Sequence, residues 1–272
     1  MSSNANWRSW VIPPSVSAWA SRHSGQQTIF DDSFGSWTEA ERASGGYNHQ
    51  KILDQVTSAT TEVLAGNACF ERDGITFPLP DFRWPLIAGL LSVAAREGSI
   101  RVLDFGGSLG STFWQHRSLL QGIDTTWAVV EQPEFVLAGQ QLDQSEVRFC
   151  NTIQSATAEM SPNVVLLSSV LQYLPDPDSV LNELLRTQAS TIILDRTPMS
   201  EAVENIPCIQ QVPKNIYSAS YPAWVFSRQW LQHQLADWEI VAEFPGIELP
   251  SVTKHGVAFS WDGLIARRVP HD

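Results

Sequence analysis

Apolar runs of strand length alternate with segments of helical period through the middle of the chain. The runs are rich in Val, Ile, Leu or Thr, which indicates buried strands at residues 100–104, 125–131, 146–150, 163–168 and 190–195. Apolar residues recur at helical spacing between these runs, over residues 111–120, 133–142 and 177–188. Alternation of this kind predicts an α/β fold, with a doubly wound, mostly parallel sheet and helices on both faces.

Helix signals also precede this pattern. A helix is predicted over residues 48–65, where Asn48 can cap the first turn and Gly66 can end the last. A second helix is predicted over residues 84–96, with Pro85 early in its first turn. Both have apolar residues on one face, so we expect them to pack against the rest of the protein.

The end of the chain returns to strands. A short helix over residues 228–236 can be capped by Ser227. Strands at 238–244 and 257–266 follow, with Pro250 between them. These two strands predict a hairpin that closes the sheet.

Two stretches interrupt the regular pattern. Residues 1–45 are irregular but contain four tryptophans, so we expect them to be packed and to include an ordered loop over 34–47. Residues 196–227 contain four prolines together with Tyr217, Tyr221 and Trp224, which favours a long loop that acts as a lid. The chain is therefore predicted to have an N-terminal cap with helices (1–97) and a second unit (98–272) that contains the lid.

The most informative stretch is Ile100-Arg-Val-Leu-Asp-Phe-Gly-Gly-Ser-Leu-Gly110, a strand that ends on Asp104 and continues into a glycine-rich turn. Glycine permits positive φ and lets a ligand approach the backbone closely. A dinucleotide fingerprint would need glycine in the pattern G-x-G-x-x-G, but position 108 is serine. A carboxylate directly before the turn would repel a pyrophosphate and would suit a cationic group, such as the ammonium of an amino acid.

Two further strand ends carry polar side chains. Glu131 ends the next strand about 20 residues after the turn, a spacing that places an acid beside a ribose in nucleotide-binding α/β folds. We expect its carboxylate to be solvated in the absence of a ligand. Ser168 and Ser169 end the strand at 163–168 and precede Leu-Gln-Tyr-Leu-Pro-Asp-Pro. Ligands of open α/β sheets bind at the carboxyl ends of the strands, so these groups, with Asn151 and Asp195, should surround one crevice.

These features together resemble the class I S-adenosylmethionine-dependent methyltransferases. Asp104-Phe-Gly-Gly-Ser-Leu-Gly110 is similar to their first motif, D/E-x-G-x-G-x-G, with Ser108 at the middle glycine. The stretch from Asn163 to Pro177 is similar to their fourth motif. Phe34-Gly-Ser-Trp37 and Gly46-Tyr47 also resemble a bacterial methyltransferase family without a defined substrate, often encoded beside genes for surface polysaccharide or secondary metabolites. The resemblance covers about residues 30–265 and implies a Rossmann-like sheet.

The resemblance implies S-adenosyl-L-methionine as cofactor and assigns roles around the crevice. The methionyl end would bind at Asp104, the ribose at Glu131, the adenine near Asn151 and the sulfonium near Ser168. The full set of implied cofactor-binding residues is Asp104, Gly106, Gly107, Ser108, Gly110, Glu131, Gln132, Asn151, Ser168, Ser169 and Gln172. Candidate contacts of the methyl acceptor are Tyr47, Tyr217, Tyr221 and Trp224, and candidate catalytic groups are His116, His233 and Tyr173.

Composition excludes several classes of function. With a net charge of −12, the chain is poorly suited to nucleic acid and to anionic membranes. Three scattered cysteines form neither a disulfide framework nor a metal motif, and no metal site is predicted. No apolar run approaches a length of ~18 residues and no signal sequence is evident, which favours a cytoplasmic location. The sequence leaves the oligomeric state open.

The favoured interpretation is methyl transfer from S-adenosylmethionine to a small molecule or a peptide-type metabolite. Oxygen is the expected acceptor atom, in a sugar hydroxyl or a carboxylate. A methyltransferase fold that binds without catalysing is the first alternative, because fold alone does not fix function. The second alternative is a nicotinamide-dependent oxidoreductase, against which Ser108 argues.

Overall fold

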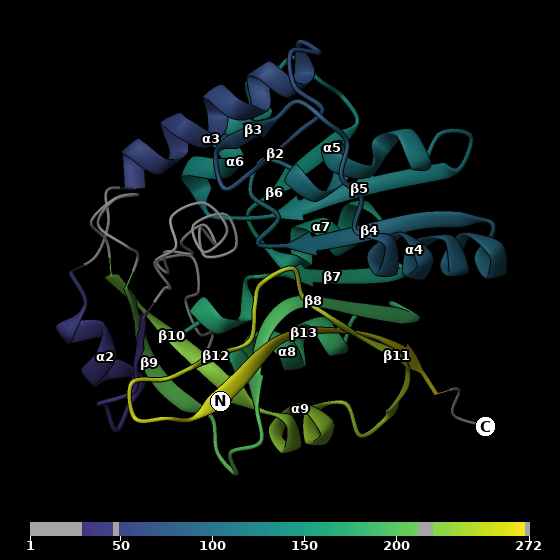
Figure 1. Ribbon diagram of the computed structural model, residues 1–272. Coiled ribbons are helices and arrows are strands. Elements are labelled where there is room, and N and C mark those ends of the chain that lie inside the picture. Colours follow the sequence, from purple (N-terminus) through teal and green to yellow (C-terminus); the bar gives the residue numbers. More distant parts are fainter. Residues whose placement is uncertain (1–28, 46–48, 212–219, 270–272) are drawn as a thin grey trace.

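The computed structural model describes residues 29–45, 49–211 and 220–269. Its main sheet has the strand order β6-β5-β4-β7-β8-β13-β11 (Figure 1). The strands from β6 to β8 are parallel, whereas β13 runs antiparallel to both of its neighbours. The bounds in chain order are β4 (Ser99–Phe105), β5 (Asp124–Val130), β6 (Val147–Cys150), β7 (Val164–Ser168), β8 (Thr191–Ser200), β11 (Trp238–Pro245) and β13 (Ala258–Arg268). The predicted fold class, a mostly parallel sheet closed by an antiparallel hairpin, is confirmed.

Helices cover both faces of this sheet because successive strand residues alternate between two apolar layers. Val102 packs in the layer under four helices, while the adjacent Leu103 packs in the opposite layer. The first layer lies under α3 (His49–Leu64), α4 (Trp84–Glu97), α5 (Ser111–His116) and α6 (Pro133–Gln140). The second lies under α7 (Ile153–Glu159), α8 (Pro177–Leu185) and α9 (Arg228–Gln234). The helices α3 and α4 thus share the core of the sheet, and a domain boundary at residue 98 stays a prediction.

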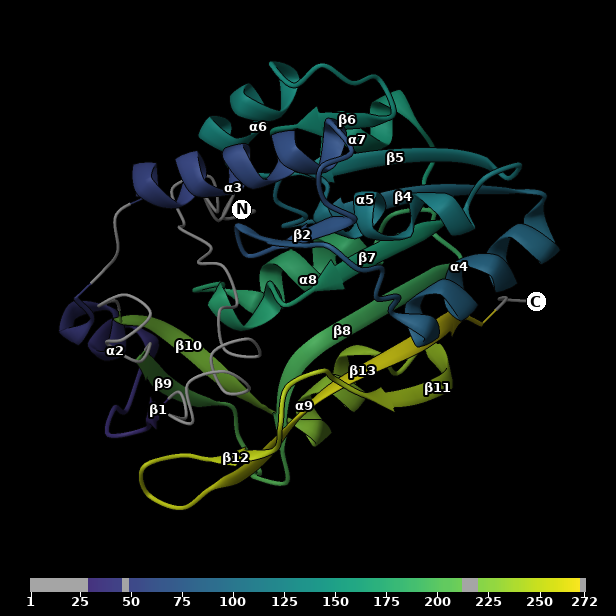
Figure 2. The same cartoon turned by 45° about the horizontal axis from the view of Figure 1, so that its top comes forward.

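The strands β8 and β13 continue beyond the main sheet into a second sheet (Figures 1 and 2). The register of their pairing shifts where Asp195 and Arg196 of β8 lie opposite Gly263 of β13, which is a β-bulge. Past the bulge, β10 pairs with the end of β8, β9 pairs with β10, and β1 pairs with β9. The bounds are β1 (Ile29–Asp31), β9 (Ile206–Gln211), β10 (Ser220–Ser227) and β12 (Ser251–Val252), the last pairing with β13.

Two expectations about irregular segments are wrong for the described residues. Much of 196–227 is strand, in β9 and β10, and not a long loop. The segment expected as a loop at 34–47 contains helix α2 (Trp37–Ala43), which Ser36 caps. The two segments lie against each other, since the ring of Trp37 stacks on that of Trp224 at 5.4 Å between centroids.

A small hairpin between α3 and α4 has no counterpart among the predicted elements. Its strands are β2 (Phe70–Arg72) and β3 (Ile75–Phe77), joined by Asp73 and Gly74. Both turn residues have positive φ, 55° and 76°, as a tight two-residue hairpin turn requires. The hairpin packs against α3 and α5, and its residues line the same crevice as the glycine-rich turn that follows β4.

Short 3₁₀ helices follow α5 and β7, at Arg117–Leu119 (η2) and Leu171–Tyr173 (η3). In the part of the chain that the structure describes, no helix has the length and apolar character needed to cross a membrane. The same residues contain no group of three or more His, Cys, Asp or Glu side chains that could hold a metal ion.

Candidate functional site

A crevice opens at the carboxyl ends of β4, β5, β7 and β8, beneath the hairpin β2–β3. Seven of the predicted cofactor-binding residues line it: Asp104, Gly106, Gly107, Ser108, Glu131, Ser168 and Ser169. The crevice has a volume of about 100 Å³.

Backbone strain is concentrated in this crevice. Four non-glycine residues of the described chain have positive φ, namely Asp73, Ser108, Ser169 and Arg196, with values of 55° or 56°. All four line the crevice. Conformations of this kind cost about 1–3 kcal/mol each and are typical of binding and catalytic sites.

Close packing explains the glycines at the start of the turn. A Cβ on Gly106 would lie 2.3 Å from the Val170 side chain, and one on Gly107 would lie 2.5 Å from the carboxyl of Asp104. The amide of Gly106 donates to the carbonyl oxygen of Val130 at 2.9 Å, which ties the turn to β5. The backbone at Gly106 and Gly107 therefore lies next to Asp104 without side chains that would block a ligand.

Asp104 ends β4 with a buried carboxyl that is 1% exposed. Trp127 Nε1 donates to its Oδ2 at 3.0 Å, while its Oδ1 has no hydrogen-bond partner among the described residues. Burial raises the pKa of this carboxyl to about 7. A buried acceptor without a partner is unfavourable, so this oxygen is suited to a charged donor supplied by a ligand.

Glu131 follows β5 and is also buried, at 4% exposure, so the expectation of a solvated carboxylate is wrong. The backbone amides of Ser108 and Gln132 donate to its two oxygens at 3.2 and 2.8 Å. Desolvation by burial raises the pKa of Glu131 to about 7. These bonds hold the carboxyl at the edge of the glycine turn, where each oxygen keeps a lone pair for a hydroxyl group.

Several predicted residues lie outside the crevice lining. Gly110 caps α5 beside Trp114, and Asn151 is exposed after β6. Gln132 is buried at the N-cap of α6, and Gln172 lies one hydrogen bond behind the lining, donating to Ser169 Oγ at 3.0 Å.

The two predicted acceptor contacts that the structure describes also lie outside the crevice lining. Tyr221 and Trp224 belong to the second sheet, where Trp224 Nε1 donates to the Leu174 carbonyl at 2.9 Å. Tyr47 and Tyr217 lie outside the described residues. Their role as acceptor contacts stays a prediction.

The three candidate catalytic groups occupy different environments. His116 lines the crevice, but its Nε2 accepts from the Arg83 amide at 2.9 Å and its Nδ1 lies 2.7 Å from the Thr112 carbonyl. Burial lowers the pKa of His116 to about 4, so the ring is neutral and both nitrogens serve the fold. His233 is exposed on α9.

Tyr173 is buried on η3, away from the lining of the crevice. Its hydroxyl donates to Gln210 Oε1 at 3.0 Å, which joins η3 to β9. Burial raises the pKa of Tyr173, which keeps the phenol protonated. None of His116, His233 and Tyr173 therefore presents a free, unprotonated nitrogen or oxygen to the crevice, as a general base would.

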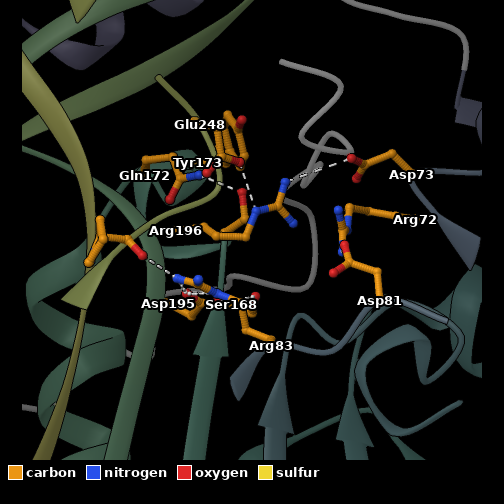
Figure 3. A network of polar contacts seen from close by, with 12 residues as sticks. Arg72, Asp73, Asp81, Arg83, Ser168, Gln172, Tyr173, Asp195, Arg196 and Glu248 are labelled. Carbon is orange, nitrogen blue, oxygen red and sulfur yellow. Dashed lines mark hydrogen bonds and ion pairs between the residues drawn. The ribbon is translucent and has the colours of Figure 1, made fainter. Parts of the chain in front are cut away.

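Sequence patterns missed a set of charged residues that converge on the mouth of the crevice. Figure 3 shows the guanidinium groups of Arg72, Arg83 and Arg196 around one region. Arg83 binds both oxygens of Asp195, with distances of 2.7–3.2 Å, and Arg196 Nε donates to Glu248 Oε1 at 2.7 Å. Arg72 lies on the hairpin β2–β3 and Arg196 at the β-bulge, two elements that carry little periodic signal, although Asp73-Gly74 is itself a known hairpin dipeptide.

No protein-family model and no curated protein matches the chain. Among solved structures, the N-terminal domain of EvdMO1 with SAH bound is similar at 14% identity and a TM-score of 0.46, covering 82% of this chain and 98% of that one. Burkholderia thailandensis 1,6-didemethyltoxoflavin-N1-methyltransferase is similar at 15% identity and a TM-score of 0.37, covering 82% and 92%. The CcbJ methyltransferase from Streptomyces caelestis is similar at 13% identity and a TM-score of 0.40, covering 71% and 92%. Since all three TM-scores are below 0.5, function has to be inferred from the residues of this chain.

Proposed function

We propose that the protein is an S-adenosylmethionine-dependent methyltransferase that acts on a small molecule or peptide-type metabolite. The observation that carries this proposal is the pair of buried carboxyls at neighbouring strand ends, Asp104 and Glu131, on either side of a glycine turn. The unpartnered Oδ1 of Asp104 suits the ammonium of the cofactor, and the Glu131 carboxyl suits its ribose hydroxyls. The sequence resemblance to the methyltransferase motifs implies the same two roles.

When bound, the cofactor supplies a methyl group that is already activated on a sulfonium. The protein then has to hold donor and acceptor in line at near-attack distance and exclude water. Ser168 and Ser169 lie at the end of β7, next to the β4 turn, and are the lining residues proposed to face the sulfonium. The strained backbone at Ser169 fixes its position there.

We further propose oxygen as the acceptor atom. Gln172 Oε1 and Glu248 Oε2 are buried acceptors without hydrogen-bond partners among the described residues. Each lies one contact behind the crevice, through Ser169 and Arg196 respectively. Acceptor atoms this close behind the lining make the surroundings of Ser169 and Arg196 polar, which supports a hydroxylated metabolite, in keeping with the biosynthetic and cytoplasmic role that the sequence favours.

The test is transfer of label from methyl-labelled S-adenosylmethionine into a library of hydroxylated and amino-containing metabolites. We expect label in a low-molecular-weight product, with stoichiometric release of S-adenosylhomocysteine and loss of both signals in Glu131→Gln. Label on a nitrogen atom of the product would refute the assignment of oxygen as the acceptor atom but would leave the methyltransferase proposal standing. Tight cofactor binding with no transfer to any acceptor would favour the non-catalytic alternative.

A further inference from the structure

Among the described residues, Arg72 differs from the other two arginines at the crevice. Arg83 and Arg196 each bind a buried carboxylate, from Asp195 and Glu248. Arg72 makes no hydrogen bond with a described residue, and its one ion-pair contact is with Asp81, at 3.9 Å. The Asp81 side chain is 64% exposed, so solvent weakens that pair.

The side chain of Arg72 is nevertheless held in place. It is 19% exposed and its guanidinium lies over the rings of Phe70 and Phe77, at 5.3 and 5.9 Å from their centroids. Arg196 contacts Asp73, the residue after Arg72, at 3.9 Å, and both arginines line the crevice (Figure 3). Guanidinium donors in a fixed fork without a hydrogen-bonded acceptor match a planar carboxylate.

The hairpin that carries Arg72 is fastened to the cofactor turn. The buried carboxyl of Glu71 binds Ser111 Oγ at the start of α5 and accepts from the amide of Gly74 at 3.1 Å. The positive φ of Asp73 and Gly74 turns the chain back over the crevice. Arg72 is therefore positioned by the fold and not by a partner of its own.

Strand order indicates which part of a ligand reaches Arg72. The carboxyl ends of β5, β4, β7 and β8 are consecutive neighbours, so a nucleoside held at Glu131 would extend across Asp104 toward the end of β8. Arg196 lies toward that end, and its contact with Asp73 brings the hairpin residue Arg72 to the same part of the crevice. An amino-acid group attached to the nucleoside would thus place its ammonium near Asp104 and its carboxylate near Arg72.

We propose that Arg72, delivered by the hairpin β2–β3, binds the carboxylate of the amino-acid end of the cofactor, opposite the ammonium site at Asp104. This inference rests on the proposed function and extends it to a residue with no sequence signal. Asp104 and Arg72 together form a site of complementary charge for an amino-acid zwitterion. The hairpin is then a wall of the cofactor site.

Two ligands separate this role from a general effect on binding. S-adenosylhomocysteine carries the amino-acid end, whereas 5′-methylthioadenosine has the same nucleoside and thioether without it. By isothermal titration calorimetry, Arg72→Met should bind S-adenosylhomocysteine about ten- to 100-fold more weakly, since a hydrogen bond to a charged group contributes this much. Its affinity for 5′-methylthioadenosine should stay within about twofold of that of the wild type.

Arg148→Met is the matched control, because Arg148 is exposed on β6 and its loss changes the net charge equally. It should leave both affinities unchanged. Arg72→Lys keeps the positive charge but loses the two-pronged guanidinium geometry. Its affinity for S-adenosylhomocysteine should fall several-fold, while its affinity for 5′-methylthioadenosine should not change. This variant provides the test if Arg72→Met does not fold.

An unchanged ratio of the two affinities in both Arg72 variants would overturn the inference and leave the proposed function standing. Failure of the wild-type protein to bind either ligand would instead refute the proposed function.

Discussion

Glu131 is the residue on which ribose binding depends in this account, and strand β5 offers its own control. The strand begins with Asp124 and is followed by Glu131, so carboxylates lie at its opposite ends. We expect Glu131→Gln to weaken binding of S-adenosylhomocysteine by about ten- to 150-fold, because charge-assisted hydrogen bonds contribute about 1.5–3 kcal/mol. Asp124→Asn removes the same charge far from the crevice and should change nothing in a calorimetric titration. Equal affinities in the two variants would assign Glu131 to the fold.

Asp104 should make the cofactor-free protein less stable as the pH rises. Its pKa is raised from 3.8 to about 7 by burial, so between about pH 4 and 7 the folded state keeps a proton that the unfolded state loses. The free energy of unfolding therefore falls across this window, by up to about 4 kcal/mol for this group. Glu71 and Glu131, whose pKa values burial also raises to about 7, act in the same direction.

Urea unfolding at pH 5, 6 and 7 measures this dependence. In Asp104→Asn, the free energy of unfolding should decrease less between pH 5 and 7 than in the wild type, because the contribution of Asp104 is removed. The contributions of Glu71 and Glu131 should remain. A variant that loses stability with pH as steeply as the wild type would show that Asp104 is ionised in the folded protein.

Among single residues, those that directly follow a strand were predictable, and those placed by irregular backbone were not. Asp104 and Glu131 could be assigned because parallel strands end at one edge of a sheet. Arg196 reaches the crevice through a β-bulge, which depends on pairing with Gly263, 67 positions further along the chain. His116 was a candidate base because it lies on the helix after the glycine turn. Its ring nitrogens contact backbone groups of Arg83 and Thr112, which the sequence could not reveal.

At the level of elements, the hairpin β2–β3 links the N-terminal region to the cofactor crevice. Gly74→Ala should strain its turn, because φ is +76° and the added Cβ would lie 2.9 Å from the Gln55 side chain. Gly66→Ala is a matched control, since φ is +79° but nothing lies within 4 Å. Both should lose about 1–2 kcal/mol of stability from the left-handed backbone.

The two glycine variants should differ in their affinity for S-adenosylhomocysteine. S-adenosylhomocysteine should bind several-fold more weakly to Gly74→Ala and normally to Gly66→Ala, as measured by calorimetry alongside thermal unfolding. Normal binding by a Gly74→Ala protein with a destabilised turn would remove the hairpin from the cofactor site.

Long periodic elements were predicted closely, and short ones were missed. Helices α3 and α4 match the expected 48–65 and 84–96 within about a residue or two at each end. The strands of the hairpin have three residues each, too few for a periodic signal. The strands β9 and β10 were hidden by Pro207 and Pro222, which lie in stretches that pair on one side only, where a missing N–H is tolerated.

At the level of the whole molecule, the main sheet forms the crevice and the second sheet packs beside it. Trp37 is 8% exposed and stacks on Trp224 of the second sheet. Trp37→Ala should therefore lower the free energy of unfolding by about 3–5 kcal/mol, whereas Trp84→Ala, 61% exposed, should cost less than about 1 kcal/mol. Neither should change the affinity for S-adenosylhomocysteine. A tenfold loss in the Trp37 variant, at a temperature where it remains folded, would place the second sheet in the cofactor site.

Four tryptophans in the first 37 residues and three large aromatic residues in 217–224 predict that the segments 1–50 and 196–227 jointly cover an acceptor site. The second sheet bears on this prediction. Strand β1 pairs with β9, so the described parts of the two segments do form one unit. Whether this unit covers the acceptor stays a proposal, since the other predicted parts of the cover lie outside the described residues. Pairing between such distant segments could not be deduced from composition, which indicated burial but not the partner.

The proposed function requires the crevice to bind both the nucleoside and the amino-acid parts of S-adenosylmethionine. The most direct measurement is a calorimetric titration of the wild-type protein with S-adenosylhomocysteine and, in parallel, with NADH. We expect saturable one-to-one binding of S-adenosylhomocysteine and no binding of NADH. The binding of S-adenosylhomocysteine should tighten between pH 6 and 8, because Asp104 releases its proton to solvent over this range and its carboxylate can then pair with the ammonium of the ligand. Binding of NADH without binding of S-adenosylhomocysteine would contradict the proposed function.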